Sequence, residues 1–283
     1  MKLKEYFFSD TQRYSWLKNT LQFLVGATFF ISMSNSADIL KILISLIGAV
    51  MAYHSVYGLN DIIDLKEDSK NPLKRSVKKV ARGEITIEEQ ASRIFLHEVI
   101  GLSICFYVSM VFGLLIAAAL VLNFFHSYKP FGIKNTPFGM INLFLIESIK
   151  FSSLWFALGG GFGNFPYFLV ICISAIYSVS YFIYKKEGDL SFIRSRRSMI
   201  FFAVIILSYF SSFYYYQQLR ITALAILPVF FLPLLIKKSA NVESRIRTGS
   251  EFTLLILLIL NLANLSPMIE LFKSISIFLA SLF

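Results

Sequence analysis

The chain has 283 residues, of which 56% are hydrophobic and only 16% are charged, and its mean hydropathy is +0.67. Soluble domains carry roughly 25% charged residues, so this composition excludes a soluble enzyme and indicates an integral membrane protein with several spans. The formal net charge of +10 would suit a nucleic-acid binder only if the basic residues formed one continuous surface.

Apolar runs long enough to cross a bilayer, or nearly so, predict about nine transmembrane helices. The run at 94–125 is too long for one ordinary span, so we divide it near 110–113 into two short helices. The other spans are expected at 16–33, 39–59, 140–158, 167–184, 199–216 and 221–236, with a ninth that starts at 252 and is interrupted or ended by Pro267. This pattern predicts one all-α membrane domain over 1–283, with a first half at 1–138 and a second half at 139–283.

Basic residues are concentrated in alternate loops. The N-terminal tail and the loops at 60–93, 126–139, 185–198 and 237–250 hold most of the 27 Lys and Arg residues, whereas the loops at 34–38, 159–166 and 217–220 hold almost none. The positive-inside rule then places the N-terminus and the basic loops in the cytoplasm of a multi-pass protein in the cell membrane. These residues serve as topology signals and candidate phosphate ligands, so we expect no nucleic-acid partner.

An acidic stretch follows the second apolar run and reads Asn60-Asp61-Ile62-Ile63-Asp64-Leu65-Lys66-Glu67-Asp68. If the helix continues through it, the three aspartates fall within about 60° of one face. Carboxylates so close together repel one another unless a cation neutralises them, and oxygen ligands beside a phosphate suit Mg²⁺. We therefore predict that Asp61, Asp64 and Asp68 bind Mg²⁺ with Asn60 beside them. The alternative is a solvated acidic helix end.

Two further polar loops follow even-numbered spans and are expected on the same side of the membrane. One reads His126-Ser127-Tyr128-Lys129-Pro130-Phe131-Gly132-Ile133-Lys134, and the other reads Lys185-Lys186-Glu187-Gly188-Asp189-Leu190 and continues to Arg197. Carboxylates and cations that meet at one membrane face suit a metal–phosphate ligand. Within the fifth span, Glu147 and Lys150 lie three residues apart, where a neutralising pair and a substrate contact remain equal alternatives.

These motifs resemble the UbiA superfamily of intramembrane prenyltransferases. The pattern Asn60-Asp61-x-x-Asp64-x-x-x-Asp68 is similar to the family's first acidic signature, and the loop at 126–134 is similar to its Tyr-Ser-x-Pro-Pro-x-Arg-x-Lys segment, with His in place of Tyr. The resemblance covers roughly residues 13–200. It implies a ring of helices around a central cavity. It also implies a transferase that moves a polyprenyl group from its diphosphate to a small acceptor, with Mg²⁺ stabilising the leaving diphosphate.

The same resemblance implies a set of site residues. Catalytic and metal-binding roles fall on Asp61, Asp64, Asp68 and Asp189, and substrate-binding roles fall on Asn60, Lys74, Arg75, Ser127, Lys134, Lys185 and Arg197. Lys185 stands where the second signature, Asp-x-x-x-Asp, has its first Asp, so the second metal site lacks one carboxylate. Lys74 and Lys134 are the preferred phosphate ligands, because both lie in segments that match family motifs.

One branch of the superfamily transfers phosphoribose to a polyprenyl phosphate, and three segments of this chain are similar to its motifs. They are Arg13-Tyr14-Ser15-Trp16-Leu17-Lys18-Asn19, Asn71-Pro72-Leu73-Lys74-Arg75 and Lys185-Lys186-Glu187-Gly188-Asp189-Leu190. Transfer from phosphoribosyl diphosphate to a polyprenyl phosphate is therefore the alternative function, although the 126–134 loop favours prenyl transfer. A non-enzymatic transporter or membrane scaffold is a third alternative, but spans with so few polar residues argue against it.

Overall fold

The computed structural model describes residues 12–34, 38–128, 133, 136, 138–185 and 196–219. Within these ranges the chain is helical and contains no strand. The long helices are α2 (Gln12–Ser34), α3 (Ile39–Ile63), α7 (Ile87–Val108), α8 (Met110–Ser127), α9 (Phe138–Ala157), α10 (Tyr167–Lys185) and α11 (Arg196–Tyr215). The short ones are α4 (Leu65–Asp68), α5 (Pro72–Val77), α6 (Lys79–Arg82) and the 3₁₀ turn η3 (Gln217–Leu219).

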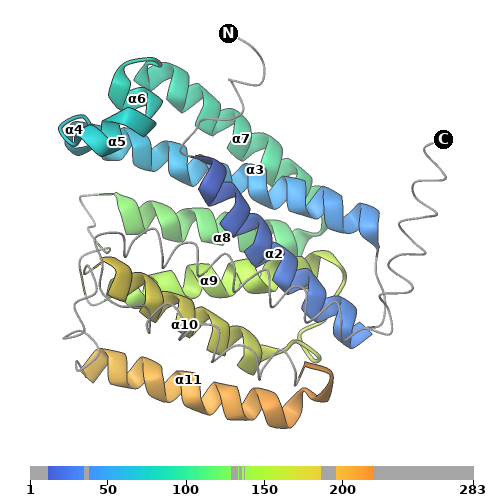
Figure 1. Cartoon of the computed structure of the whole chain (residues 1–283). Coiled ribbons are helices and arrows are strands. Elements are labelled where there is room, and N and C mark those ends of the chain that lie inside the picture. Colours follow the sequence, from blue (N-terminus) through green and yellow to red (C-terminus); the bar gives the residue numbers. More distant parts are fainter. Residues whose placement is uncertain are drawn as a thin grey trace.

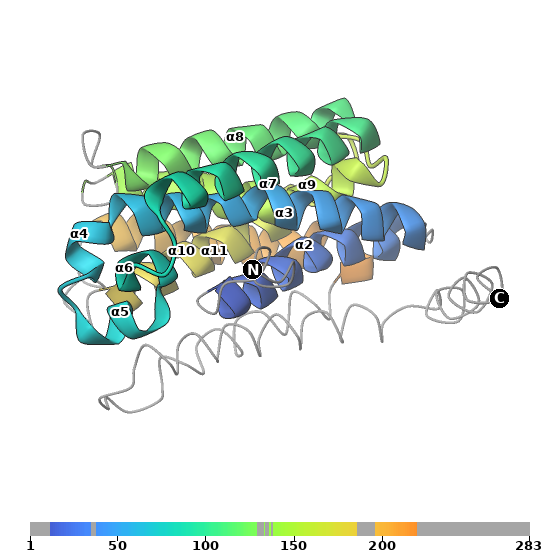
Figure 2. The ribbon, with the colours of Figure 1, turned by 90° about the horizontal axis from the view of Figure 1, so that it is seen from above.

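The long helices lie side by side with their axes roughly aligned, and the short helices α4, α5 and α6 gather at one end of the bundle (Figures 1 and 2). Consecutive helices from α7 onward alternate in direction, so α3, α8 and α10 all end at the same end of the bundle (Figure 1). The three polar loops expected on one side of the membrane therefore leave helices that end together. Among the helices of the described residues, four (α3, α7, α8 and α9) are long and apolar enough to cross a membrane by length and composition.

The predicted division of the run at 94–125 is confirmed at Ser109. That residue is extended, with φ −166° and ψ 135°, and it separates α7 from α8, which pack against each other. Helix α7 begins at Ile87, earlier than the expected residue 94, because Thr86 and Glu89 form a capping box at its start. The Thr86 side chain accepts a hydrogen bond from the Glu89 backbone N–H at 3.1 Å, and the Glu89 side chain accepts one from the Thr86 backbone N–H at 3.0 Å. The spans expected at 221–236 and from 252 lie outside the described residues.

Helices α3 and α7 pack against each other, and a glycine lies at their contact. A Cβ at Gly101 of α7 would collide with the backbone of Ala52 on α3, so any larger side chain would push the two helices apart. Small residues at such crossings let membrane helices approach and pack by van der Waals contact. This pairing fixes α3, whose C-terminal end carries the acidic stretch.

Helix α9 lies between two apolar clusters. One cluster joins it to α2, α10 and α11 through residues such as Phe151 and Ile173, and the other joins it to α2, α3 and α8 through residues such as Ile146 and Phe112. Of the four candidate spans, α9 is the most enclosed by protein. Its polar residues Glu147 and Lys150 are therefore buried inside the bundle rather than facing lipid.

Candidate active site

The acidic stretch forms a helix that is interrupted at one residue. Helix α3 continues through Asn60 and Asp61 to Ile63, and α4 resumes at Leu65. Between them Asp64 has φ −91° and ψ 4°, so the expected uninterrupted helix is broken there. Helical hydrogen bonds persist on both sides, from Asp64 N to Asn60 O at 2.9 Å and from Asp68 N to Asp64 O at 2.9 Å. The near-helical spacing therefore survives, and Asp61 and Asp68 face the same neighbour.

That neighbour is Lys78. Its Nζ lies 2.8 Å from Asp61 Oδ1 and 2.6 Å from Asp68 Oδ2. The Asp68 side chain is fully buried, and that of Asp61 is 11% exposed. Burial by itself lowers the pKa of Lys78, but the charges and hydrogen bonds of Asp61 and Asp68 outweigh it and raise the pKa above the usual value for lysine. A charged ammonium group therefore sits between two buried carboxylates.

From the sequence, Lys78 is expected only as one of the basic residues of the 60–93 loop, which are topology signals and candidate phosphate ligands. Its contact with the aspartates depends on the way α5 and α6 fold back, so that α6 packs against both α3 and α4. Lys78 is the residue just before α6, and Gly83 ends that helix in a left-handed conformation, with φ +76°. The only indication in the sequence was Gly83 itself, because a glycine often ends a helix and lets the chain change direction.

The described residues hold only part of the predicted site. Asn60 Oδ1 is buried and has no hydrogen-bond partner in the described part of the chain, Asp64 is half-buried, and Ser127 is the last residue of α8. Asp189, Lys134 and the side chains of Lys74, Lys185 and Arg197 lie outside the described residues. Among those that are described, no three His, Cys, Asp or Glu side chains converge as a metal site. The structure thus brings Asp61 and Asp68 together through Lys78, without Asp64 as a third member.

The potential metal ligands among the described residues nevertheless suit a hard cation. Asn60 Oδ1 is a buried carbonyl oxygen without a partner, and it adjoins Asp61, whose carboxylate already binds one cation, Lys78. All of these donors are oxygens, the ligand type that Mg²⁺ prefers. An ammonium group between two carboxylates marks a place where positive charge is stabilised.

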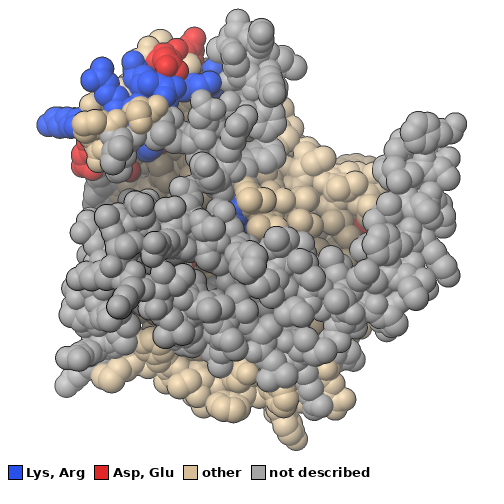
Figure 3. Space-filling view, viewed as in Figure 1, with Lys and Arg blue, Asp and Glu red and all other residues tan. Residues whose placement is uncertain are grey.

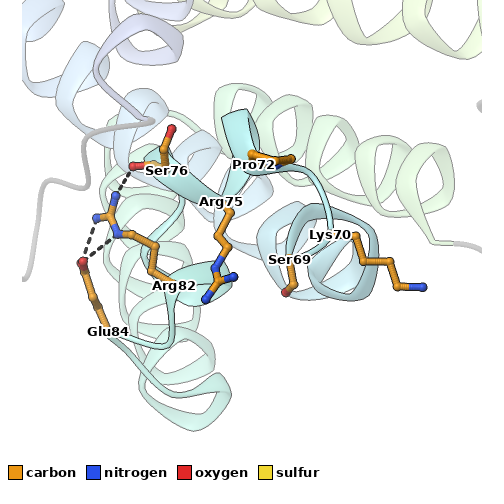
Figure 4. Close-up of a pocket in the computed structure, with 7 residues that line it drawn as sticks. All are labelled: Ser69, Lys70, Pro72, Arg75, Ser76, Arg82 and Glu84. Carbon is orange, nitrogen blue, oxygen red and sulfur yellow. Dashed lines mark hydrogen bonds and ion pairs between the residues drawn. The ribbon is translucent and has the colours of Figure 1, made fainter.

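A basic pocket lies beside the acidic stretch. It has a volume of about 520 Å³ and is lined by Ser69, Lys70, Pro72, Arg75, Ser76, Arg82 and Glu84. Arg82 is held in place by Glu84, at 2.6 Å from Nε to Oε1, and by the Ser76 carbonyl (Figure 4). In this view Arg75 points between Arg82 and Ser69, whereas Lys70 points away. Figure 3 shows Lys, Arg, Asp and Glu side chains gathered at the corner where Figure 1 places α4, α5 and α6.

Polar side chains continue from the acidic stretch into the bundle. One turn before Asp61 on α3, the Tyr57 hydroxyl accepts a hydrogen bond from Asn19 Nδ2 at 2.8 Å. One turn deeper, Tyr53 and Asn123 of α8 are hydrogen-bonded, with Asn123 Nδ2 donating at 3.0 Å. Hydrogen-bonded phenol and amide groups therefore extend inward from the acidic stretch.

A family model described as the UbiA prenyltransferase family matches residues 20–265. The chain belongs to the UbiA prenyltransferase family. The predicted superfamily, the all-α multi-pass membrane fold and the assignment as a prenyltransferase enzyme are thereby confirmed. No curated protein matches the chain.

Solved structures of UbiA homologues share the fold. A homologue from Archaeoglobus fulgidus bound to GPP and Mg²⁺ is 15% identical with a TM-score of 0.72, and the match covers 92% of this chain and 99% of that one. An apo homologue from Aeropyrum pernix K1 is 15% identical with a TM-score of 0.60, covering 89% and 97%. A structure of digeranylgeranylglyceryl phosphate synthase is 15% identical with a TM-score of 0.61, covering 92% and 96%. At this identity these UbiA structures support the fold of the chain.

Proposed function

We propose that this UbiA-family enzyme transfers a polyprenyl group from its diphosphate to a small acceptor, in a reaction that depends on Mg²⁺. The observation that carries the proposal is the buried pair Asp61 and Asp68 around one cation at the end of α3, in a chain of this family. The UbiA homologue from Archaeoglobus fulgidus was solved with GPP and Mg²⁺ and, separately, with DMAPP and Mg²⁺, which supports this donor class.

Mg²⁺ would be held by Asp61, Asp64 and Asp68 with Asn60, and Asp189 would complete the site from the second polar loop. The metal would stabilise negative charge on the diphosphate as it leaves. Lys78 would contribute a fixed positive charge at the same place, since its ammonium group already lies between two of these carboxylates. Lys74, Arg75, Ser127, Lys134, Lys185 and Arg197 are proposed to bind the remaining phosphate oxygens.

The proposed reaction balances as a substitution at the first carbon of the prenyl chain. The bond from this carbon to the diphosphate oxygen breaks, and both of its electrons leave with the diphosphate. An electron pair of the acceptor forms the new bond, and the acceptor loses one proton. The apolar and aromatic interior of the bundle suits the prenyl chain, and aromatic faces stabilise positive charge on the allylic carbon.

We propose that the site opens to the cytoplasm at the cell membrane. The basic loops and the ends of α3, α8 and α10 lie at one end of the bundle (Figure 1), and the positive-inside rule assigns such loops to the cytoplasmic side. The partners would then be a membrane-embedded prenyl lipid and an acceptor that enters from the cytoplasm or from the lipid.

Phosphoribosyl transfer to a polyprenyl phosphate remains a second candidate, and the basic pocket favours it. A cavity of about 520 Å³ with Arg75, Arg82 and two serine hydroxyls suits a phosphorylated sugar better than a prenyl chain. In that reaction the lipid phosphate would be the acceptor, and the sugar diphosphate would bind outside the bundle.

One experiment separates the two candidates. Purified protein with Mg²⁺ is given labelled geranylgeranyl diphosphate and candidate acceptors in one reaction, and labelled phosphoribosyl diphosphate and polyprenyl phosphate in another. We expect label to move from the prenyl donor. Label that moves only from the sugar donor would reverse the assignment, and label that moves from neither would contradict both.

A further inference from the structure

Two buried histidines meet where α7 packs against α3, two helices that lie side by side in the bundle (Figures 1 and 2). The rings of His54 on α3 and His97 on α7 have centroids 4.9 Å apart and are tilted by 58°. The two residues are 5% and 4% exposed. Tyr53, the chain neighbour of His54, contacts α8 and α9 instead. The histidine pair therefore belongs to the interface between α3 and α7.

The hydrogen bond of His97 fixes which of its ring nitrogens carries the proton. His97 Nδ1 lies 2.8 Å from the backbone carbonyl oxygen of Arg93. A carbonyl oxygen only accepts, so Nδ1 donates, and in a neutral imidazole Nε2 is then the basic nitrogen. A second proton would bind to Nε2 and convert the ring to a cation. His97 can therefore titrate without losing its hydrogen bond to Arg93.

A proton on either ring would place a positive charge in an unfavourable position. Arg93 is one helical turn before His97 on α7, is 5% exposed and carries a permanent charge. The two rings are close enough that a charge on one opposes a charge on the other. Burial adds the cost of removing a charged imidazole from water. The closed interface therefore favours neutral rings, although free histidine titrates near pH 6.5, at about physiological pH.

The carboxylates near the pair along the chain have other partners or positions. On α3, Asp61 is seven residues after His54, about 10 Å along the helix, and it binds Lys78 at 2.8 Å. On α7, Glu98 follows His97 directly, so it points about 100° away around the helix, and it is partly exposed. The other charged or titratable side chains described on helices packed against α3 or α7 are Lys18 of α2, Lys66, Glu67 and Asp68 of α4, Lys79 and Arg82 of α6, His126 of α8, and Glu147 and Lys150 of α9. On the face of α7 that carries the pair, the neighbouring charge is therefore positive.

The interface on both sides of the pair is too tightly packed to absorb that charge by a small shift. A Cβ at Gly58, four residues after His54, would lie 2.7 Å from Gln90 Nε2 of α7. A Cβ at Gly48, six residues before His54, would lie 3.1 Å from Cys105 Sγ of α7. Closely packed interfaces have discrete arrangements and do not deform continuously. A charge on the pair is therefore relieved by separation of α3 from α7 and entry of water.

We propose that His54 and His97 form a pH-sensitive clamp between α3 and α7. Neutral rings keep the two helices packed, and protonation of either ring separates them. The open form binds more protons than the closed form, so the closed form is stable above about pH 6.5 and is lost as the pH falls below it. Because α3 ends in the acidic stretch, opening moves Asn60 and Asp61 and weakens metal binding there. The clamp does not depend on which group the enzyme transfers.

Cys105 can report on this contact in the full-length protein. It lies beside Gly48 of α3 and is fully buried, whereas Cys172 on α10 is equally buried and packs against α11. The protein in detergent is treated with 4,4′-dithiodipyridine, which modifies thiols at acidic as well as neutral pH, and the labelling of each cysteine is measured by mass spectrometry. The ratio of Cys105 to Cys172 labelling cancels the effect of pH on the reagent.

We expect this ratio to rise about tenfold or more between about pH 7.5 and about pH 5.5. A ring that is protonated only in the open form shifts the opening equilibrium about tenfold at one pH unit below its ordinary pKa. A ratio that stays constant would overturn the clamp. Equal exposure of both cysteines would also overturn it, because this result would mean general unfolding in acid.

Three variants assign the rise to the pair. His54→Phe keeps a ring, and His97→Asn keeps an N–H group for the Arg93 carbonyl, but neither new side chain can be protonated. The double variant should lose the rise, and each single variant should show a smaller one. His126→Phe is the matched control, since the third histidine of the chain is also buried but lies outside the pair.

A double variant that protects Cys105 at neutral pH and still shows the wild-type rise would overturn the proposal. If it exposes Cys105 already at neutral pH, the two single variants decide by the same criterion. The rise in unfolding temperature caused by Mg²⁺ tests the effect on the acidic stretch. Between about pH 7.5 and about pH 5.5 the wild type should lose more of this rise than the double variant, since protonation of the aspartates is common to both. An equal loss would contradict the coupling of the clamp to the acidic stretch.

Discussion

Lys78 Nζ lies 2.8 Å from Asp61 Oδ1, so the acidic stretch at the end of α3 is already neutralised in part by a residue of the same chain. The same ammonium group contacts Asp68 at 2.6 Å. Two buried carboxylates would repel each other without it. Lys78 therefore provides a positive charge at the place where a divalent cation is proposed to bind. This charge should determine how much the stability of the folded protein depends on bound metal.

Replacing Lys78 with Met should make the stability of the folded protein depend on Mg²⁺. Removing one partner of a buried ion pair costs about 3–5 kcal/mol, and somewhat less here because the Lys78 side chain is 18% exposed. Added Mg²⁺ should restore much of the loss by taking the place of the ammonium group. The measurement is the unfolding temperature in detergent with EDTA and with Mg²⁺. A variant that Mg²⁺ stabilises no more than it stabilises the wild type would contradict this account.

Neutralising the first two aspartates should abolish turnover. We expect Asp61→Asn and Asp64→Asn each to lose Mg²⁺-dependent prenyl transfer while remaining folded in detergent, because each removes a carboxylate from the proposed metal site. Glu67→Gln is the matched control, since Glu67 lies in the same stretch but is exposed. EDTA should stop the wild-type reaction. Activity that survives both single changes, or that is indifferent to EDTA, would remove the metal assignment.

Much of the fold could be predicted from the sequence, but only part of the site, because the fold depends on local properties and the site also depends on tertiary packing. Helix positions follow from hydropathy, which is a local property, and even the break near 110 was visible as an excess of length. The face shared by Asp61 and Asp68 follows from helical spacing. The contact with Lys78 could not be predicted, because it depends on how α5 and α6 return to α3. The same holds for Lys18 and Glu147, which are distant in sequence and meet only through packing of α2 on α9.

Gly101 should be intolerant of larger side chains. Gly101→Leu places atoms where the α3 backbone at Ala52 now lies, so the two helices must separate, at a cost of about 1–3 kcal/mol or more for an overpacked site. The expected result is a lower unfolding temperature together with reduced activity, because α3 carries the acidic stretch. Gly161→Leu is the control, since a Cβ atom at Gly161 would have no neighbour within 4 Å. Equal unfolding temperatures for the two variants would show that the α3–α7 contact does not limit stability.

Alanine substitutions should reduce activity at the basic residues proposed as phosphate ligands, but not at those that only set membrane topology. We expect Lys74→Ala and Lys134→Ala each to raise the KM of the diphosphate donor or to lower kcat at least tenfold. A lost charge-assisted hydrogen bond of about 1.5–3 kcal/mol has this effect on affinity or rate. Lys66→Ala is the comparison, because Lys66 is exposed and lies on the short helix α4 within the acidic stretch. Steady-state kinetics with labelled geranylgeranyl diphosphate provide the measurement. If both variants keep wild-type kinetics, Lys74 and Lys134 only orient the chain in the membrane, and the phosphate ligands must be sought among Arg75, Arg82 and Lys78.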